Sequence, residues 1–130
     1  MLGNAAAVTM LPAVDLDRAI RYYTDVLGLK PVDIGTPPEA GLAAFTAGGG
    51  TQLALYLRGA TKADHTVLTF IVADIEAELD ALVSKGVKFE QYNLPDFGLV
   101  TDARGIAELG GTKNAWFKDT EGNLLALAEM

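Results

Sequence analysis

The chain has 130 residues, half of them hydrophobic, which is enough for one compact domain or for two small modules that share a core. It contains no cysteine, which excludes disulfides and thiolate chemistry and makes the cytoplasm the expected location. A net charge of −7 argues against nucleic acid as a partner, and it fits either ordinary solubility or a cavity for cationic ligands. No apolar run is long enough to span a membrane, so no membrane partner is expected.

The first half of the chain predicts a strand, a helix and three further strands. Residues 8–16 read VTMLPAVDL, a β-type apolar stretch that runs into Asp15, whose carboxylate is expected to cap the helix that follows. Apolar residues then recur at helical spacing as far as Gly28, which is a natural helix stop. The predicted strands are Lys30–Ile34, Gly41–Ala47 and Thr51–Leu57.

The second half repeats this order. Residues 67–75 read VLTFIVADI, with Asp74 as the expected cap and Gly86 as the expected end of the helix. The distance from strand to helix end differs by one residue between the halves, which a single insertion explains. Residues 93–112 are expected to form a long irregular connection, either a lid or a solvated loop. The predicted strands are Val87–Tyr92, Lys113–Lys118 and Asn123–Glu129.

The sequence therefore encodes a βαβββ unit twice, over residues 1–60 and 64–130 approximately, with Thr61–Asp64 as the joint. This arrangement predicts an α+β fold. Each half has only about 60 residues, so its sheet needs the other sheet, or a partner's, to bury its apolar face.

Two stretches carry a family resemblance: LDRAIRYYTDVLGLKPV after the first strand, and WFKDTEGNLLAL at the end of the chain. Together with the paired βαβββ units, they resemble the vicinal oxygen chelate superfamily, which includes glyoxalase I, bleomycin-resistance proteins and extradiol dioxygenases. The resemblance covers essentially the whole chain. It implies that residues 1–130 form a single domain with a U-shaped mixed sheet around a cavity, and that the protein is a homodimer. It is specific for the fold and weak for the activity, because one scaffold hosts many chemistries.

The resemblance also indicates where a metal would bind. Members that use a metal take its ligands, usually His, Gln or Glu, from the first, fourth, fifth and eighth strands. These positions correspond to Val8, Leu55, Val67 and Ala126, and no residue of Gln52–Leu57 is an acid in any register. A divalent ion needs several aligned donors, which four aliphatic side chains do not provide. We therefore expect no metal and no other cofactor.

His65, the only histidine, lies two residues before Val67 and would face the same side of a strand. It is either a solvent-facing residue at the strand edge or a hydrogen-bonding or acid–base group of the pocket. Nucleophilic catalysis has little support, because a single histidine is present and no GxSxG turn accompanies it. No catalytic residue is assigned.

The remaining candidates are apolar or aromatic. Trp116 is either a pocket residue or a core or dimer contact, and Tyr92 ends a strand of the same half. Met10 would share a face with Val8, while Phe45 belongs to the core or to the pocket. The candidate cavity residues are Val8, Met10, Phe45, Leu55, His65, Val67, Tyr92, Trp116 and Ala126.

These observations favour metal-independent binding of a small organic molecule, with cationic and aromatic compounds as the classes considered. Two alternatives stay open. One is a metal-dependent enzyme of the glyoxalase or dioxygenase type. The other is a metal-free lyase or isomerase that uses His65, Tyr92 or Glu129 as an acid–base group.

Overall fold

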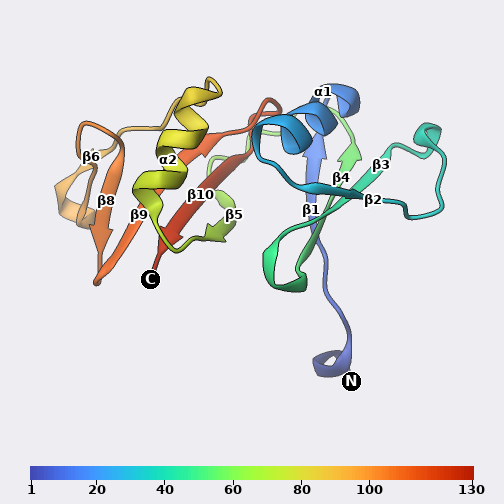
Figure 1. The fold of residues 1–130 in the computed structure, drawn as a ribbon, viewed down its shortest axis with the longest axis horizontal. Helices are drawn as coiled ribbons and strands as arrows, with labels where there is room; N and C mark the ends of the chain where they lie inside the picture. The colour runs from blue at the N-terminus through green and yellow to red at the C-terminus, as the bar shows by residue number, and fades with distance from the viewer. The chain divides into compact units, whose positions relative to one another are not determined.

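The computed structural model describes residues 1–130, apart from the side chain of Pro38. Contacts between Cα atoms divide the chain into two compact units, unit 1 (Met1–Lys62) and unit 2 (Ala63–Met130). Each unit contains a mixed four-stranded sheet with one helix packed against it, blue to green in unit 1 and green to red in unit 2 (Figure 1). The predicted α+β class is confirmed. Among the described residues, no helix is long and apolar enough to cross a membrane.

The sheet of unit 1 has the strand order β1-β4-β3-β2, in which β1 runs parallel to β4 and the other neighbours are antiparallel. Its helix continues directly into a π-helical turn. The elements are β1 (Thr9–Ala13), α1 (Leu16–Arg21), the π-helical turn (Tyr22–Val26), β2 (Lys30–Val32), β3 (Leu42–Thr46) and β4 (Gln52–Leu57).

The boundaries of this helix follow from its capping groups. The Asp15 carboxylate accepts a hydrogen bond from the Arg18 N–H at 3.0 Å, which satisfies one of the free donors of the first turn. In the π-helical turn the Leu27 N–H donates to the Tyr22 carbonyl at 3.1 Å, one residue further back than in an α-helix. The extra residue inferred from the sequence is accommodated in this wider turn. Gly28 ends the helix with a φ of 74°.

The core of unit 1 lies between α1 and one face of the sheet. Tyr23 and Phe45 are buried with their ring centroids 5.9 Å apart, so Phe45 points towards the helix. Leu11 and Leu55 are partners in the β1–β4 register and are also fully buried. Because side chains alternate along a strand, Met10 and its partner Ala54 occupy the opposite face, called here the open face.

The sheet of unit 2 repeats the arrangement with the order β5-β10-β9-β8, and β5 runs parallel to β10. A separate two-stranded hairpin, β6–β7, precedes β8. The elements are β5 (Thr66–Ile71), α2 (Ile75–Ser84), β6 (Asn93–Leu94), β7 (Leu99–Val100), β8 (Ile106–Leu109), β9 (Thr112–Lys118) and β10 (Leu124–Glu129).

The sequence prediction was wrong at one edge of this sheet. The strand expected over 87–92 is reduced to a bridge between Phe89 and Phe117 and a hydrogen bond from the Glu90 N–H to the Trp116 carbonyl at 2.8 Å. The segment 93–112, expected to be irregular, instead contains the hairpin and β8. The physical reason is that two short segments share the edge of β9, with β8 on its first half and residues 89–90 near its end.

Gly105 lies where these two segments meet. A Cβ atom at this position would come within 3.0 Å of both the Glu90 carbonyl oxygen and the Phe89 Cβ, and the residue has a φ of 96°. Glycine is therefore required by close packing and by backbone conformation at once.

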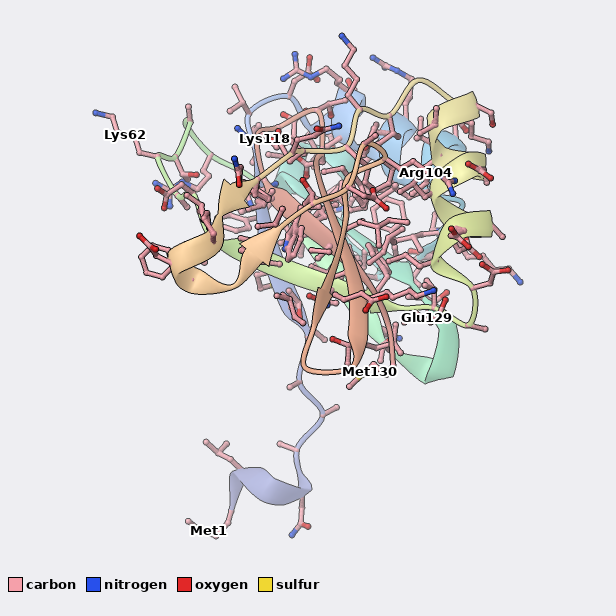
Figure 2. All side chains as sticks on the ribbon, turned by 90° about the vertical axis from the view of Figure 1, so that its left-hand side faces the viewer. Met1, Lys62, Arg104, Lys118, Glu129 and Met130 are labelled. Atoms are coloured by element: carbon pink, nitrogen blue, oxygen red, sulfur yellow. The ribbon has the colours of Figure 1, made fainter. Side chains whose placement is uncertain are left out.

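Several contacts fix α2 on one face of the sheet. The Asp74 carboxylate accepts from the Ala77 N–H at 3.1 Å, and the Glu129 carboxylate, from the end of β10, accepts from the Ile75 N–H at 2.9 Å. Arg104 pairs with Glu76 at 3.2 Å and with Asp80, both on the helix. Figure 2 shows Arg104 and Glu129 on the α2 side of unit 2. The open face of unit 2 is the opposite one.

Candidate ligand site on the open face of unit 2

The centre of this open face is formed by small residues. Ala126 and Ala128 of β10 are 3% and 5% exposed. In register with Ala126 lie Thr69 on β5 and Trp116 on β9, so one row of the sheet runs from a hydroxyl through an alanine to an indole. Side chains in register on adjacent strands face the same side of the sheet. The small side chain of Ala126 therefore lies directly beside the indole ring of Trp116.

Tyr92 places a second aromatic ring against Trp116. Its ring centroid is 5.5 Å from that of Trp116 and the ring planes are at 81°, an edge-to-face contact. The local backbone explains the contact, because the hydrogen bond from Glu90 to the Trp116 carbonyl brings the segment before Tyr92 alongside β9. Both rings are half-buried, which leaves part of each surface available to a ligand.

The electrostatics of the pair keep the phenol protonated. Burial, and to a smaller extent the negative charge of Glu90, raises the pKa of Tyr92 above its ordinary value. Glu90 itself lies 3.8 Å from the Lys118 ammonium group. At neutral pH the Tyr92 hydroxyl is therefore a hydrogen-bond donor and is poorly suited to act as a general base.

The structure brings together three of the candidates predicted from the sequence, namely Tyr92, Trp116 and Ala126. Val67 is half-buried on β5, where the register with β10 shifts between Leu124 and Leu125. His65 is exposed and precedes β5, so the expectation that it shares a strand face with Val67 was wrong.

The other candidates belong to unit 1. Val8 and Met10 are 44% and 49% exposed, and Met10 is on the open face of that unit. Phe45 and Leu55 are placed in the packed core beneath α1, at 1% and 0% exposure. Sequence reasoning had left Phe45 open between core and pocket, and the register now assigns it to the core.

Comparing the registers of the two units also locates the fourth-strand position of the family's metal site. The corresponding pairs are Phe45–Leu53 and Ala44–Ala54 in unit 1, and Phe117–Leu125 and Trp116–Ala126 in unit 2. Ala54, and not Leu55, is therefore the counterpart of Ala126. The side chains at the four positions, Val8, Ala54, Val67 and Ala126, carry no donor atom and do not fit a metal ion. In the part of the chain that the structure describes, no group of three or more His, Cys, Asp or Glu residues is arranged to hold one.

A depression of about 600 Å³ also exists in unit 2, beside β8 and the hairpin. Its lining is largely polar and charged and contains none of the candidate cavity residues predicted from the sequence. The lining residues are Glu76, Gly98, Val100, Thr101, Asp102, Ile106, Glu108 and Lys113. Three carboxylates and one lysine make it a solvated surface, and the aromatic pair remains the stronger candidate site.

Sequence reasoning missed Thr69 and Glu90. Both positions depend on long-range strand pairing. The alternation of β5 alone does not place Thr69 beside Ala126, because the register shift next to Val67 changes which residues meet β10. Glu90 was read as part of a regular strand that the structure does not form.

The family model of the Glyoxalase/Bleomycin resistance protein/Dioxygenase superfamily matches residues 6–127. The chain belongs to this superfamily. Its fold is similar to that of a superfamily member from Sphaerobacter thermophilus, at 24% identity and a TM-score of 0.69 over 96% of this chain and 98% of that one. No curated protein sequence matches significantly.

Two further solved structures illustrate the range of functions on this fold. The antibiotic-binding protein TnmS3 from a Streptomyces species is 20% identical, with a TM-score of 0.67 and coverage of 97% of both chains. Lactoylglutathione lyase from Agrobacterium tumefaciens is 22% identical, with a TM-score of 0.66 over 97% of this chain and 93% of that one. At these identities the similarity shows the shared fold alone.

Proposed function

We propose that this protein binds a small organic molecule, without a metal ion, on the open face of unit 2. The observation that carries the proposal is the row in which Ala126 occupies the family's carboxylate position directly beside Trp116. An alanine there supplies no metal ligand, and it leaves the side of the indole free of a bulky neighbour. The site then binds by shape and apolar contact in place of coordination.

The chemistry of the surrounding groups favours a flat aromatic guest. The indole of Trp116 offers a large apolar surface, and the protonated Tyr92 hydroxyl offers one directional hydrogen bond. A cationic substituent is favoured over an anionic one, because Glu90 lies beside Tyr92 and the whole chain has a net charge of −7. The solved antibiotic-binding protein supports the general class, since it shows that a protein of this fold can serve as a binder.

Intrinsic fluorescence tests the proposal directly, because Trp116 is the only tryptophan. Chelator-treated protein is titrated with acridine and with N-methylacridinium, a neutral and a cationic ring of similar shape. We expect a saturable change in Trp116 emission, tighter binding of the cation, and no change in affinity when Zn²⁺, Mn²⁺ or Fe²⁺ is added. Stoichiometric metal in protein purified without chelator, or binding that requires added metal, would disprove metal independence.

A pair of variants tests whether the ring pair is the site. Trp116→Ala should weaken binding, measured by calorimetry, about 30-fold, which corresponds to about 2 kcal/mol for the loss of a buried aromatic contact. Met10→Ala is the matched control, because Met10 has the corresponding register position to Thr69 on the open face of unit 1. It should change the affinity less than about twofold. Equal losses in the two variants would show that the guest is not confined to unit 2.

The proposal also includes a homodimer and a cytoplasmic location. The dimer is supported by the small size of each sheet, which has one face without a helix, and by the family resemblance. Light scattering across a range of concentrations tests it. A particle of one chain, 13.7 kDa, at every concentration would refute the dimer.

A further inference from the structure

At the base of the β6–β7 hairpin, Tyr92 and Thr101 are joined by three hydrogen bonds. The Tyr92 N–H donates to the Thr101 hydroxyl at 2.8 Å, and the same hydroxyl donates to the Tyr92 carbonyl at 3.2 Å. The Thr101 N–H donates to that carbonyl as well, at 2.9 Å. Both backbone polar groups of Tyr92 are therefore satisfied by one residue, and the side chain of Thr101 provides two of the three bonds.

The position of Tyr92 needs such a constraint. It follows the short bridge at Phe89 and precedes the two-residue strand β6, so regular sheet pairing on either side is limited. The hairpin beyond it is largely exposed, with Phe97 at its tip 82% exposed. In Figure 2 the hairpin, in pale orange, is drawn apart from α2, in yellow. The hydrogen bonds and ion pairs that fix α2 are made by Asp74, Glu129 and Arg104, which lie outside the hairpin.

We propose that Thr101 is a positioning residue, which fixes the backbone of Tyr92 and thereby holds the Tyr92 ring edge-on against Trp116. This inference rests on the proposed function of the ring pair as a ligand site. Thr101 acts through Tyr92 and touches no ligand itself. Its hydroxyl accepts from the Tyr92 N–H and adds a second bond to the Tyr92 carbonyl, and an aliphatic side chain of equal size can make neither bond.

The first test uses the protein without any ligand. Thr101→Val keeps the shape of the side chain and removes both hydroxyl bonds, while Thr101→Ser keeps the hydroxyl. Tyr92→Ala, which removes the ring, sets the upper reference for acrylamide quenching of Trp116. We expect the Stern–Volmer constant of Thr101→Val to rise from the wild-type value by at least half of the increase seen in Tyr92→Ala. Thr101→Ser should keep the wild-type value. Thr112→Val is the matched control, because the Thr112 hydroxyl also donates to a backbone carbonyl of unit 2, that of Leu109, at 2.6 Å.

A merely structural role is separated by two further measurements. Thermal unfolding of all variants shows how much stability each hydroxyl contributes, and the quenching change of Thr101→Val should exceed that of Thr112→Val at equal loss of stability. In a Tyr92→Ala background, Thr101→Val should add no further quenching, because the ring it positions is already absent. If Thr101→Val does not fold, Thr101→Ala replaces it in the same comparison.

Ligand binding supplies the second arm. Thr101→Val should weaken N-methylacridinium binding by the same factor as Tyr92→Ala, about three- to tenfold for one aromatic contact. Quenching in Thr101→Val that matches the wild type or Thr112→Val would overturn the role of Thr101. If the wild-type protein binds neither acridine, the proposed function fails for these guests, and the ligand-free quenching experiment still decides the role of Thr101.

Discussion

The two units share one side of their sheets and differ on the other. On the side covered by the helix, a leucine of the last strand pairs with a phenylalanine of its antiparallel neighbour in both units, as Leu53–Phe45 and Leu125–Phe117. Each phenylalanine contacts another aromatic ring, Tyr23 in unit 1 at 5.9 Å and Phe89 in unit 2 at 5.3 Å. The helix-covered face is similar in both units because each helix packs on its sheet through the same kind of apolar contact.

The open faces of the two units differ at the register positions next to these leucine–phenylalanine pairs. The row that reads Met10, Ala54 and Ala44 in unit 1 reads Thr69, Ala126 and Trp116 in unit 2. An alanine occupies the centre of both rows, but only unit 2 places an indole beside it. The comparison shows that the core face carries the fold, and that the candidate site arises from substitutions on the face that the helix does not need.

The shared core face predicts equal and large penalties for removing either phenylalanine. Phe45 and Phe117 are 1% and 0% exposed, so truncation to alanine leaves a cavity under the helix in each unit. We expect Phe45→Ala and Phe117→Ala each to lower the free energy of unfolding by about 3–5 kcal/mol. Urea denaturation followed by circular dichroism measures both.

An exposed phenylalanine serves as the control for these two variants. Phe97→Ala, at the tip of the hairpin, should change the free energy of unfolding by less than about 0.5 kcal/mol. If one core variant cost less than about 1 kcal/mol while the other cost 4, the equivalence of the two helix-covered faces would be wrong.

A smaller difference between the units concerns the helix N-termini. Both helices have a capping aspartate, Asp15 or Asp74, and α2 also receives the Glu129 carboxylate from the end of the last strand. Glu129→Ala should lower the free energy of unfolding by about 1 kcal/mol, because the partly buried Ile75 N–H loses its acceptor. Glu129→Gln, which keeps an acceptor oxygen, should lower it by less.

The exposed Glu108 on β8 gives a matched control for the effect of charge alone. Glu108→Ala removes the same charge from the same sheet and should have an effect of less than about 0.5 kcal/mol in the urea experiment. Identical values for Glu108→Ala and Glu129→Ala would mean that the bond to Ile75 contributes nothing measurable.

Local signals in the sequence were sufficient for most of the fold. Asp15 and Asp74 cap their helices as predicted, because a capping carboxylate acts on N–H groups three residues away. The family resemblance to the glyoxalase and bleomycin-resistance proteins is confirmed by the match over residues 6–127. These features need only short-range pattern or overall element order.

The candidate site was harder to predict, because it depends on register between strands distant in sequence. Alternation correctly separated Trp116 from Phe117, but it could not show which of them faces the helix. Leu55 was taken for a cavity position although its neighbour Ala54 is on the open face, an error of one residue that turns the side chain to the other side of the sheet. The split edge of β9 was missed because residues 93–112 were expected to form one irregular connection.

The smallest predicted effect concerns the titration of Tyr92. Burial and Glu90 raise its pKa, so the folded state favours the neutral phenol. This contribution to stability is complete below the unfolded-state pKa of about 10 and is lost as the pH rises through the higher folded-state value. A tyrosinate next to Trp116 should quench the indole. The emission of Trp116 should therefore fall as Tyr92 ionises, at a pH above the ordinary phenol pKa of about 10.

Two variants test this assignment. Tyr92→Phe should remove the fall in emission. Glu90→Gln should move its midpoint to lower pH by only part of the shift, because burial is the larger cause. An unchanged midpoint in Glu90→Gln would show that the carboxylate does not act on the ring pair, and would remove the electrostatic reason for expecting a cationic guest in unit 2.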